Sequence, residues 1–246
     1  NFSEGVGIQL SSNAIRILRK FDLEKDIIQI ASYPLTVDCI NGNSGRKIVS
    51  IPLGEFAEKK FKAGFYQLYR NDLISILKKK IKHLGIKINY DSPVTDVKQD
   101  SSKVTLKLGK VIFNFDLLVG ADGINSLVRK KIFHSYQPKF LNQVAYRTLI
   151  PSNILPDRFS EDKTLLFLGS AKHVVSYPIK SRSMINFVFC MDFKNFNDQD
   201  WSKKVKPSEL NHNFSDFYSI HDVLSKISFL KKWGLFEHTI LKKWYK

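Results

Sequence analysis

Apolar residues recur along the chain at helical spacing in some stretches and alternate with polar residues in others. The clearest helix is predicted over residues 71–84, which Gly85 ends, and a shorter amphipathic helix is predicted over 11–21. A hairpin is predicted over 33–53, where the turn residues 41–45 separate two alternating runs. The stripe of the longer helix consists of Leu73, Ile74, Leu77, Ile81 and Leu84.

Strand patterns dominate the middle and the second half of the sequence. The apolar run 117–119 is predicted to be a strand covered on both faces. After residue 133 strands follow one another with little helix between them, as in an antiparallel sheet, before helices predicted over 207–218 and 221–229. The other predicted strands are 86–90, 94–98, 104–108, 111–115, 143–150, 164–168, 174–179 and 185–191.

The order of these elements predicts an α/β fold with two parts. Residues 1–133 are interpreted as an incomplete, Rossmann-like dinucleotide-binding part, and residues 134–246 as a β-rich substrate-binding layer with C-terminal helices. The hairpin at 33–53 is predicted to belong to the substrate-side sheet. The chain therefore crosses between the two parts more than once.

The composition is that of a folded globular protein without a disulfide framework. An apolar share of 43% and an aromatic share of 13% argue against disorder. The two cysteines, Cys39 and Cys190, fit a reducing, cytoplasmic setting. No apolar stretch approaches the roughly 20 residues that span a bilayer. We therefore expect no transmembrane segment. The histidines lack metal-ligand spacing, so we also expect no metal site.

The formal net charge of +16 admits two interpretations, a basic surface that binds nucleic acid or a solvated surface rich in lysine. The paired lysines fall on different predicted elements, without interleaved aromatics and without a recognition motif. We therefore expect no specific nucleic-acid partner.

The segment 116–129 carries the most informative motif. Its apolar run leads into Asp122-Gly123, and Ser126 and Arg129 fall on the first turns of the helix that follows. A carboxylate and a glycine in such a turn suit a nucleotide, because the start of a helix presents free N–H groups. The same residues also fit an ordinary strand–turn–helix unit with no ligand.

This motif resembles the second flavin fingerprint of the FAD-dependent aromatic hydroxylases, the single-component flavoprotein monooxygenases. That fingerprint pairs an Asp-Gly with a Ser three residues on and an Arg three further on, as Asp122, Ser126 and Arg129 do. Further segments resemble the family in the same order along the chain. They are residues 5–14, 69–73, 173–179 and 184–188.

Two motifs of that family are not found in the sequence. No Gly-x-Gly-x-x-Gly follows a strand, and residues 233–244 resemble only the run that leads into the family's Gly-Asp motif. The resemblance therefore implies an internal part of a longer protein. We expect the 246 residues alone to bind FAD poorly and to be inactive.

The resemblance implies a monooxygenase that takes FAD, NADH or NADPH, and O2 to hydroxylate a small aromatic acid or phenol. It implies that the residues around the cofactor are Gly7, Arg70, Asp122, Gly123 and Arg129. The alternatives are that Arg70 is a surface arginine and that Arg129 only holds the Asp122 turn together.

Three residues are candidates for contact with the substrate. His173 could bind or deprotonate a phenolic hydroxyl, because the pKa of histidine lies near neutral pH. Arg147 could pair with a substrate carboxylate, and Tyr177 follows His173 on the same predicted strand. A structural role for His173 and a solvent-facing Arg147 remain the alternatives.

Rival functions within the same fold are a quinone-precursor hydroxylase, a halogenase and a reductase. Outside it, the rivals are a non-catalytic flavin-fold protein and a basic module associated with nucleic acid.

Overall fold

The structure, a computed structural model, describes residues 6–134, 138–194 and 203–246. They form two compact units. Unit 1 comprises Asn1–Ile86 and Gln143–Gly234, and unit 2 comprises Lys87–Asn142 and Leu235–Lys246. These units interleave along the sequence, whereas the predicted boundary at residue 133 divides the chain by function and stays a prediction.

A large sheet organises unit 1, in the strand order β12-β13-β8-β11-β10-β9-β2-β3. Neighbouring strands from β8 to β9 are antiparallel, and β2 runs parallel to β9. The predicted hairpin over 33–53 forms β2 and β3 at one edge. The strands are β2 (Thr36–Asn41), β3 (Lys47–Pro52), β8 (Lys139–Pro151), β9 (Lys163–Gly169), β10 (Lys172–Ile179), β11 (Met184–Asp192), β12 (Lys203–Val205) and β13 (Leu230–Glu237).

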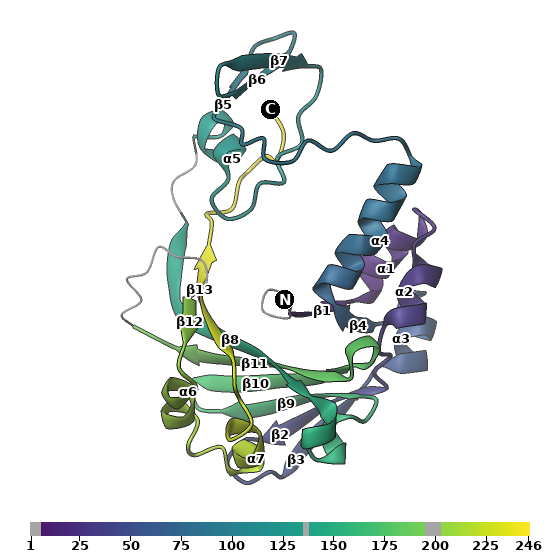
Figure 1. Cartoon of the computed structure of the whole chain (residues 1–246), viewed down its shortest axis with the longest axis vertical. Coiled ribbons are helices and arrows are strands. Elements are labelled where there is room, and N and C mark those ends of the chain that lie inside the picture. The colour runs from purple at the N-terminus through teal and green to yellow at the C-terminus, as the bar shows by residue number, and fades with distance from the viewer. Residues whose placement is uncertain (1–5, 135–137, 195–202) are drawn as a thin grey trace. The chain divides into compact units, whose positions relative to one another are not determined.

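One face of this sheet is an aromatic core. The rings of Phe187 and Phe189 in β11 stack at 6.0 Å, and Phe189 meets the edge of Phe214 at 5.3 Å. Phe214 and Phe217 are fully buried at the end of helix α6 (Pro207–Asn213), and α7 (His221–Leu224) follows. These helices cover this face of the sheet (Figure 1).

The opposite face carries polar residues, because side chains alternate along each strand. The pairings His173–Cys190, Tyr177–Asn186 and Arg147–Val188 place these side chains on that side of β8, β10 and β11. We call it the polar face and define it by Arg147, His173, Tyr177, Asn186 and Cys190.

Two short strands and four helices complete unit 1. Strand β1 (Gly7–Leu10) pairs with β4 (Tyr66–Tyr69), and the pair lies on the side of the large sheet away from α6 and α7 (Figure 1). The helices are α1 (Ser12–Arg19), α2 (Glu24–Ile30), α3 (Gly54–Phe61) and α4 (Arg70–His83). The predicted helices over 11–21 and 71–84 are α1 and α4, whose apolar sides join the core around Ile15, Ile27 and Leu68.

Short 3-10 helices connect some of the strands and helices of unit 1. They are Ser152–Ile154, Asp157–Phe159, Lys180–Arg182 and Tyr218–Ile220. The two helices predicted over 207–218 and 221–229 are shorter than expected, since α6 ends at Asn213 and α7 at Leu224.

Unit 2 contains a three-stranded antiparallel meander, as predicted, and one short helix. The elements are β5 (Asp96–Gln99), β6 (Val104–Leu108), β7 (Val111–Phe115) and α5 (Leu127–Ile132). No helix of the described residues is long and apolar enough to cross a membrane.

The strands predicted over 86–90 and 117–119 are wrong. Both segments lack regular structure, and Leu117 and Val119 are 78% and 77% exposed. A strand needs a neighbour to take its backbone hydrogen bonds, and the described residues place no strand beside either segment.

Candidate functional site

Gly7 brings β1 into close contact with the polar face. Its N–H donates to Asn186 Oδ1 at 2.8 Å. A Cβ atom on Gly7 would lie 2.6 Å from Tyr177 Oη and 2.7 Å from Asn186 Cγ. Glycine is therefore required here by packing within the protein, and its predicted contact with the cofactor stays a prediction.

Tyr177 and Asn186 are fixed at this end of the polar face. Tyr177 packs with Tyr69 and Ile179, and burial raises the pKa of its hydroxyl, against a smaller opposing effect of the Arg147 charge. The Nδ2 atom of Asn186 is buried without a partner among the described residues. Sequence reasoning missed Asn186, although a polar residue between Ile185 and Phe187 in an apolar strand was a usable signal.

Arg147 lies further along the polar face. Its guanidinium carbon is 5.3 Å from the centre of the Trp233 ring, and its Nε is buried without a hydrogen-bond partner. Among the described residues no carboxylate forms an ion pair with it. The charge of Arg147 opposes the effect of burial, which raises the pKa of the Cys190 thiol. The positive charge of this half-buried side chain therefore has no counter-charge within the part of the chain that the structure describes.

His173 pairs with Cys190 across β10 and β11 and is half-buried. Burial lowers the pKa of its imidazole below the ordinary value, because the charged form loses hydration. The ring is therefore neutral at pH 7, the state in which histidine accepts a proton.

Arg70 is the first residue of α4, and its side chain is exposed. Its backbone N–H donates to the Val6 carbonyl at 3.0 Å, which joins the start of α4 to β1. Asp72, in the same turn, forms an ion pair with Arg182, whereas the Arg70 side chain has no ion pair among the described residues. Its guanidinium is therefore available to an external anion.

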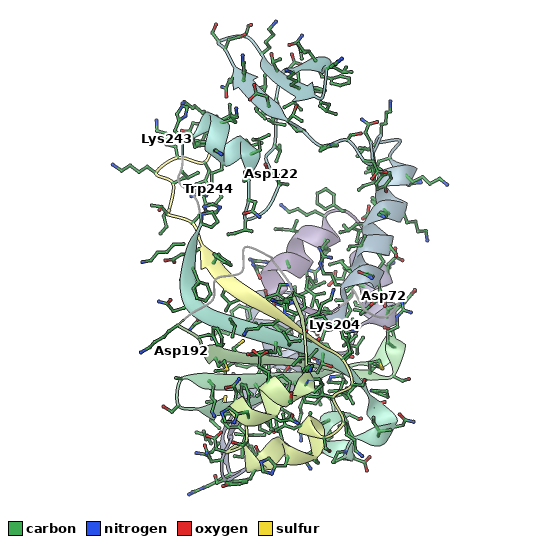
Figure 2. All side chains as sticks on the ribbon, turned by 60° about the vertical axis from the view of Figure 1, so that its left-hand side comes forward. Asp72, Asp122, Asp192, Lys204, Lys243 and Trp244 are labelled. Atoms are coloured by element: carbon green, nitrogen blue, oxygen red, sulfur yellow. The ribbon has the colours of Figure 1, made fainter. Side chains whose placement is uncertain are left out.

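In unit 2, Asp122 lies in the loop before α5 (Figure 2). Ser126 Oγ donates to its carboxylate at 2.5 Å, and the Val128 N–H donates at 3.1 Å. Burial raises the pKa of Asp122, but these hydrogen bonds, together with the backbone N–H groups of Leu127 and Asp122 itself, outweigh burial and leave the pKa lowered. Ser126 in turn caps α5 by accepting from the Arg129 N–H at 3.0 Å. The carboxylate stabilises its own turn, as the ligand-free alternative expects.

Gly123, beside it, adopts a left-handed backbone with φ +78°, and open space surrounds the position of a Cβ. That conformation favours glycine, and the open space leaves the backbone accessible. Within unit 2, this accessible glycine turn fits the approach of a nucleotide.

Arg129 holds the C-terminal segment against this loop. Its guanidinium donates to the Thr239 carbonyl, and the His238 ring lies 2.5 Å from the Ile124 carbonyl oxygen. Lys246 Nζ donates to the Ile132 carbonyl at 3.0 Å. The guanidinium of Arg129 thus joins α5 to the C-terminal segment, and both its role in the Asp122 turn and its contact with a cofactor stay predictions.

The predicted residues thus fall into two groups. Unit 1 brings together Gly7 and Tyr177, with Arg147 and His173 on the same face, whereas Asp122, Gly123 and Arg129 belong to unit 2. Among the described residues no group of three His, Cys, Asp or Glu side chains is placed to hold a metal ion.

Comparison with known proteins gives a consistent result. A model described as FAD binding domain matches residues 7–245. The 3-amino-4-hydroxybenzoate 2-monooxygenase of Streptomyces cremeus is 23% identical over 96% of this chain and 58% of its own length. The 3-hydroxybenzoate 6-hydroxylase of Klebsiella oxytoca is 24% identical over 98% of this chain and 61% of its own length. The chain therefore spans about three fifths of the length of these relatives.

A solved salicylate hydroxylase substrate complex superposes with a TM-score of 0.80 at 19% identity, covering 96% of this chain and 62% of that one. At 19% identity, this similarity shows that the two chains share a fold. Because the family model extends over nearly all 246 residues, the chain belongs to the FAD binding domain family.

Proposed function

We propose that the whole protein is an FAD-dependent monooxygenase that hydroxylates a small aromatic acid with O2. The observation that carries the substrate class is Arg147, a cation on the half-open polar face with no carboxylate partner among the described residues. The names of similar proteins support it, since hydroxybenzoate and salicylate both carry a carboxylate beside an aromatic ring.

FAD, once bound and reduced by NADH or NADPH, would supply the oxygen-activating chemistry that no side chain provides. In unit 1, Arg70 would contact the cofactor through its guanidinium and Gly7 through its backbone. In unit 2, Gly123 would contact it through its backbone, and Asp122 and Arg129 would shape the turn around Gly123. Two free cysteines among the described residues support a reducing, cytoplasmic compartment.

The polar face would orient the substrate. Arg147 would bind the carboxylate through its planar fork of donors, and the neutral His173 would accept the proton of the ring hydroxyl. Loss of that proton makes the ring more electron-rich and so easier to oxygenate. Tyr177 would form the wall where the polar face meets β1, because its ring is fixed against Tyr69 and Gly7.

A panel of aromatic acids and phenols tests this function in the whole protein, with NAD(P)H oxidation measured against hydroxylated product. We expect a bound-flavin absorbance and coupled product formation with an aromatic acid. A flavin enzyme that forms halogenated or reduced product would favour the rival enzymes of this fold. Protein that purifies without flavin and cannot be loaded with FAD would contradict the proposal.

Arg147→Gln removes the charge and keeps a polar side chain. We expect KM for a hydroxybenzoate to rise about ten- to a hundredfold, as for the loss of a charge-assisted hydrogen bond. The matched control is Arg16→Gln, which removes an exposed arginine of α1. Unchanged KM in Arg147→Gln would show that the carboxylate binds elsewhere.

A further inference from the structure

Arg147 is half-buried, and its partner differs in kind from the partners of three exposed arginines of unit 1. Each of these three arginines forms an ion pair with a carboxylate. The pairs are Arg19 with Glu24, Arg158 with Asp222, and Arg182 with Asp72. The Arg147 guanidinium instead lies over the Trp233 ring, 5.3 Å from its centre. A ring attracts the cation but carries no net charge to neutralise it.

Trp233 reaches the polar face because of the alternation along β13. Its neighbour Lys232 turns to the opposite face, where it is 7% exposed and its ammonium lies 2.7 Å from Glu209. Lys232 also lies 5.4 Å from the centre of the Tyr146 ring, which belongs to the aromatic core side. Lys232 is therefore fixed on the core side, and Trp233, the next residue, is directed to the side of Arg147.

This arrangement restricts the orientation of the guanidinium. The flat ring favours a guanidinium lying over it, and the buried Nε leaves the terminal nitrogens as the donors that reach outward. A carboxylate takes two parallel hydrogen bonds from such a fork, whereas a neutral phenol has no group that matches it.

We propose that Trp233 is a positioning residue that holds the Arg147 guanidinium ready for the carboxylate of the substrate, and so sets a preference for aromatic acids over neutral phenols. This rests on the proposed function, in which Arg147 binds that carboxylate. Trp233 acts through Arg147 and need not touch the substrate.

The test compares 3-hydroxybenzoate with phenol, which differ only in the carboxylate. Their dissociation constants are measured by calorimetry on the flavin-loaded whole protein, for Trp233→Leu, Trp233→Phe, Arg147→Gln and the double variant Trp233→Leu/Arg147→Gln. The matched control is Trp244→Leu, which removes an indole that is 77% exposed in unit 2 (Figure 2).

We expect Trp233→Leu to weaken 3-hydroxybenzoate binding about three- to thirtyfold, the range of a partly buried cation–π contact, while phenol binding changes less than about twofold. Trp233→Phe should retain most of the affinity, because a phenyl face also attracts the cation. In the Arg147→Gln background Trp233→Leu should add little, since the two residues act as one unit.

Two results would overturn the proposal, and they differ in what they imply for the proposed function. Equal weakening of both ligands by Trp233→Leu would make Trp233 a packing residue and leave the proposed function intact. A parent protein that binds 3-hydroxybenzoate no better than phenol would remove the carboxylate role of Arg147, and with it the role of Trp233.

Discussion

Asp122 is the residue at which a family motif and a local structural role meet. Its carboxylate accepts hydrogen bonds from Ser126 and Val128, and its lowered pKa reflects them. The backbone N–H groups of Leu127 and of Asp122 itself also lower the pKa of this carboxylate. The carboxylate is thus held within its own turn, and its contact with a cofactor stays a prediction.

Substitution at Asp122 separates the two roles. We expect Asp122→Ala to lower the free energy of unfolding by about 1–2 kcal/mol, because two donors lose their acceptor, and to weaken flavin retention. Asp122→Asn, which keeps one oxygen acceptor, should cost less stability. Urea denaturation and gel filtration of the flavin-loaded protein measure the two effects.

The control for this pair is Asp116→Ala, an exposed aspartate earlier in the same segment. If Asp122→Ala lost stability but kept its flavin as well as the parent, the carboxylate would serve the turn alone.

At the scale of elements, β1 makes a close contact with β10 and β11 on the polar face. Gly7 allows this contact, because Tyr177 and Asn186 occupy the position that a Cβ atom would take. The pairing of Gly7 with Tyr69 ties this contact to the start of α4. Displacing β1 would therefore also move the backbone around Arg70, whose N–H bonds to Val6.

Gly7→Ala should displace β1 and destabilise the protein by about 1–3 kcal/mol, as overpacking does. In a Tyr177→Leu background the same substitution should cost less, since the nearest ring atoms are gone. Unfolding midpoints of the four proteins in this cycle give the coupling between the two positions. Additive costs would show that Tyr177 does not limit the approach.

At the scale of the whole molecule, the net charge of +16 is spread over both units. Several lysines already have acidic partners: Lys131 lies 2.8 Å from Asp96, and Lys80 lies 3.5 Å from Asp22. The remaining charge favours diffuse, salt-dependent attraction to polyanions.

We expect weak binding to random-sequence DNA that is lost between about 50 and 200 mM salt, because it depends on counterion release. Binding of 3-hydroxybenzoate, which carries one charge, should change far less over that range. Fluorescence anisotropy of a labelled oligonucleotide measures the first effect and calorimetry the second. DNA affinity that survives 200 mM salt, or that depends on base sequence, would favour the nucleic-acid module instead.

The sequence by itself determined the local elements and the family. Helices α1 and α4, the hairpin β2–β3 and the strands β8 to β11 follow from periodicity, because each period fixes which side chains share a side of one element. The Asp122-Gly123 motif was likewise readable, since its turn is formed by hydrogen bonds between residues close in sequence.

Only the tertiary structure decided which residues face one another across elements. The Arg147 guanidinium lies over the Trp233 ring because β8 and β13 are neighbours in the large sheet. The N–H of Gly7 donates to Asn186 although β1 belongs to a separate, two-stranded sheet. Periodicity predicted residues 117–119 as a strand, yet they lack regular structure. A strand forms by hydrogen bonding to a neighbour, and the identity of that neighbour is a property of the fold.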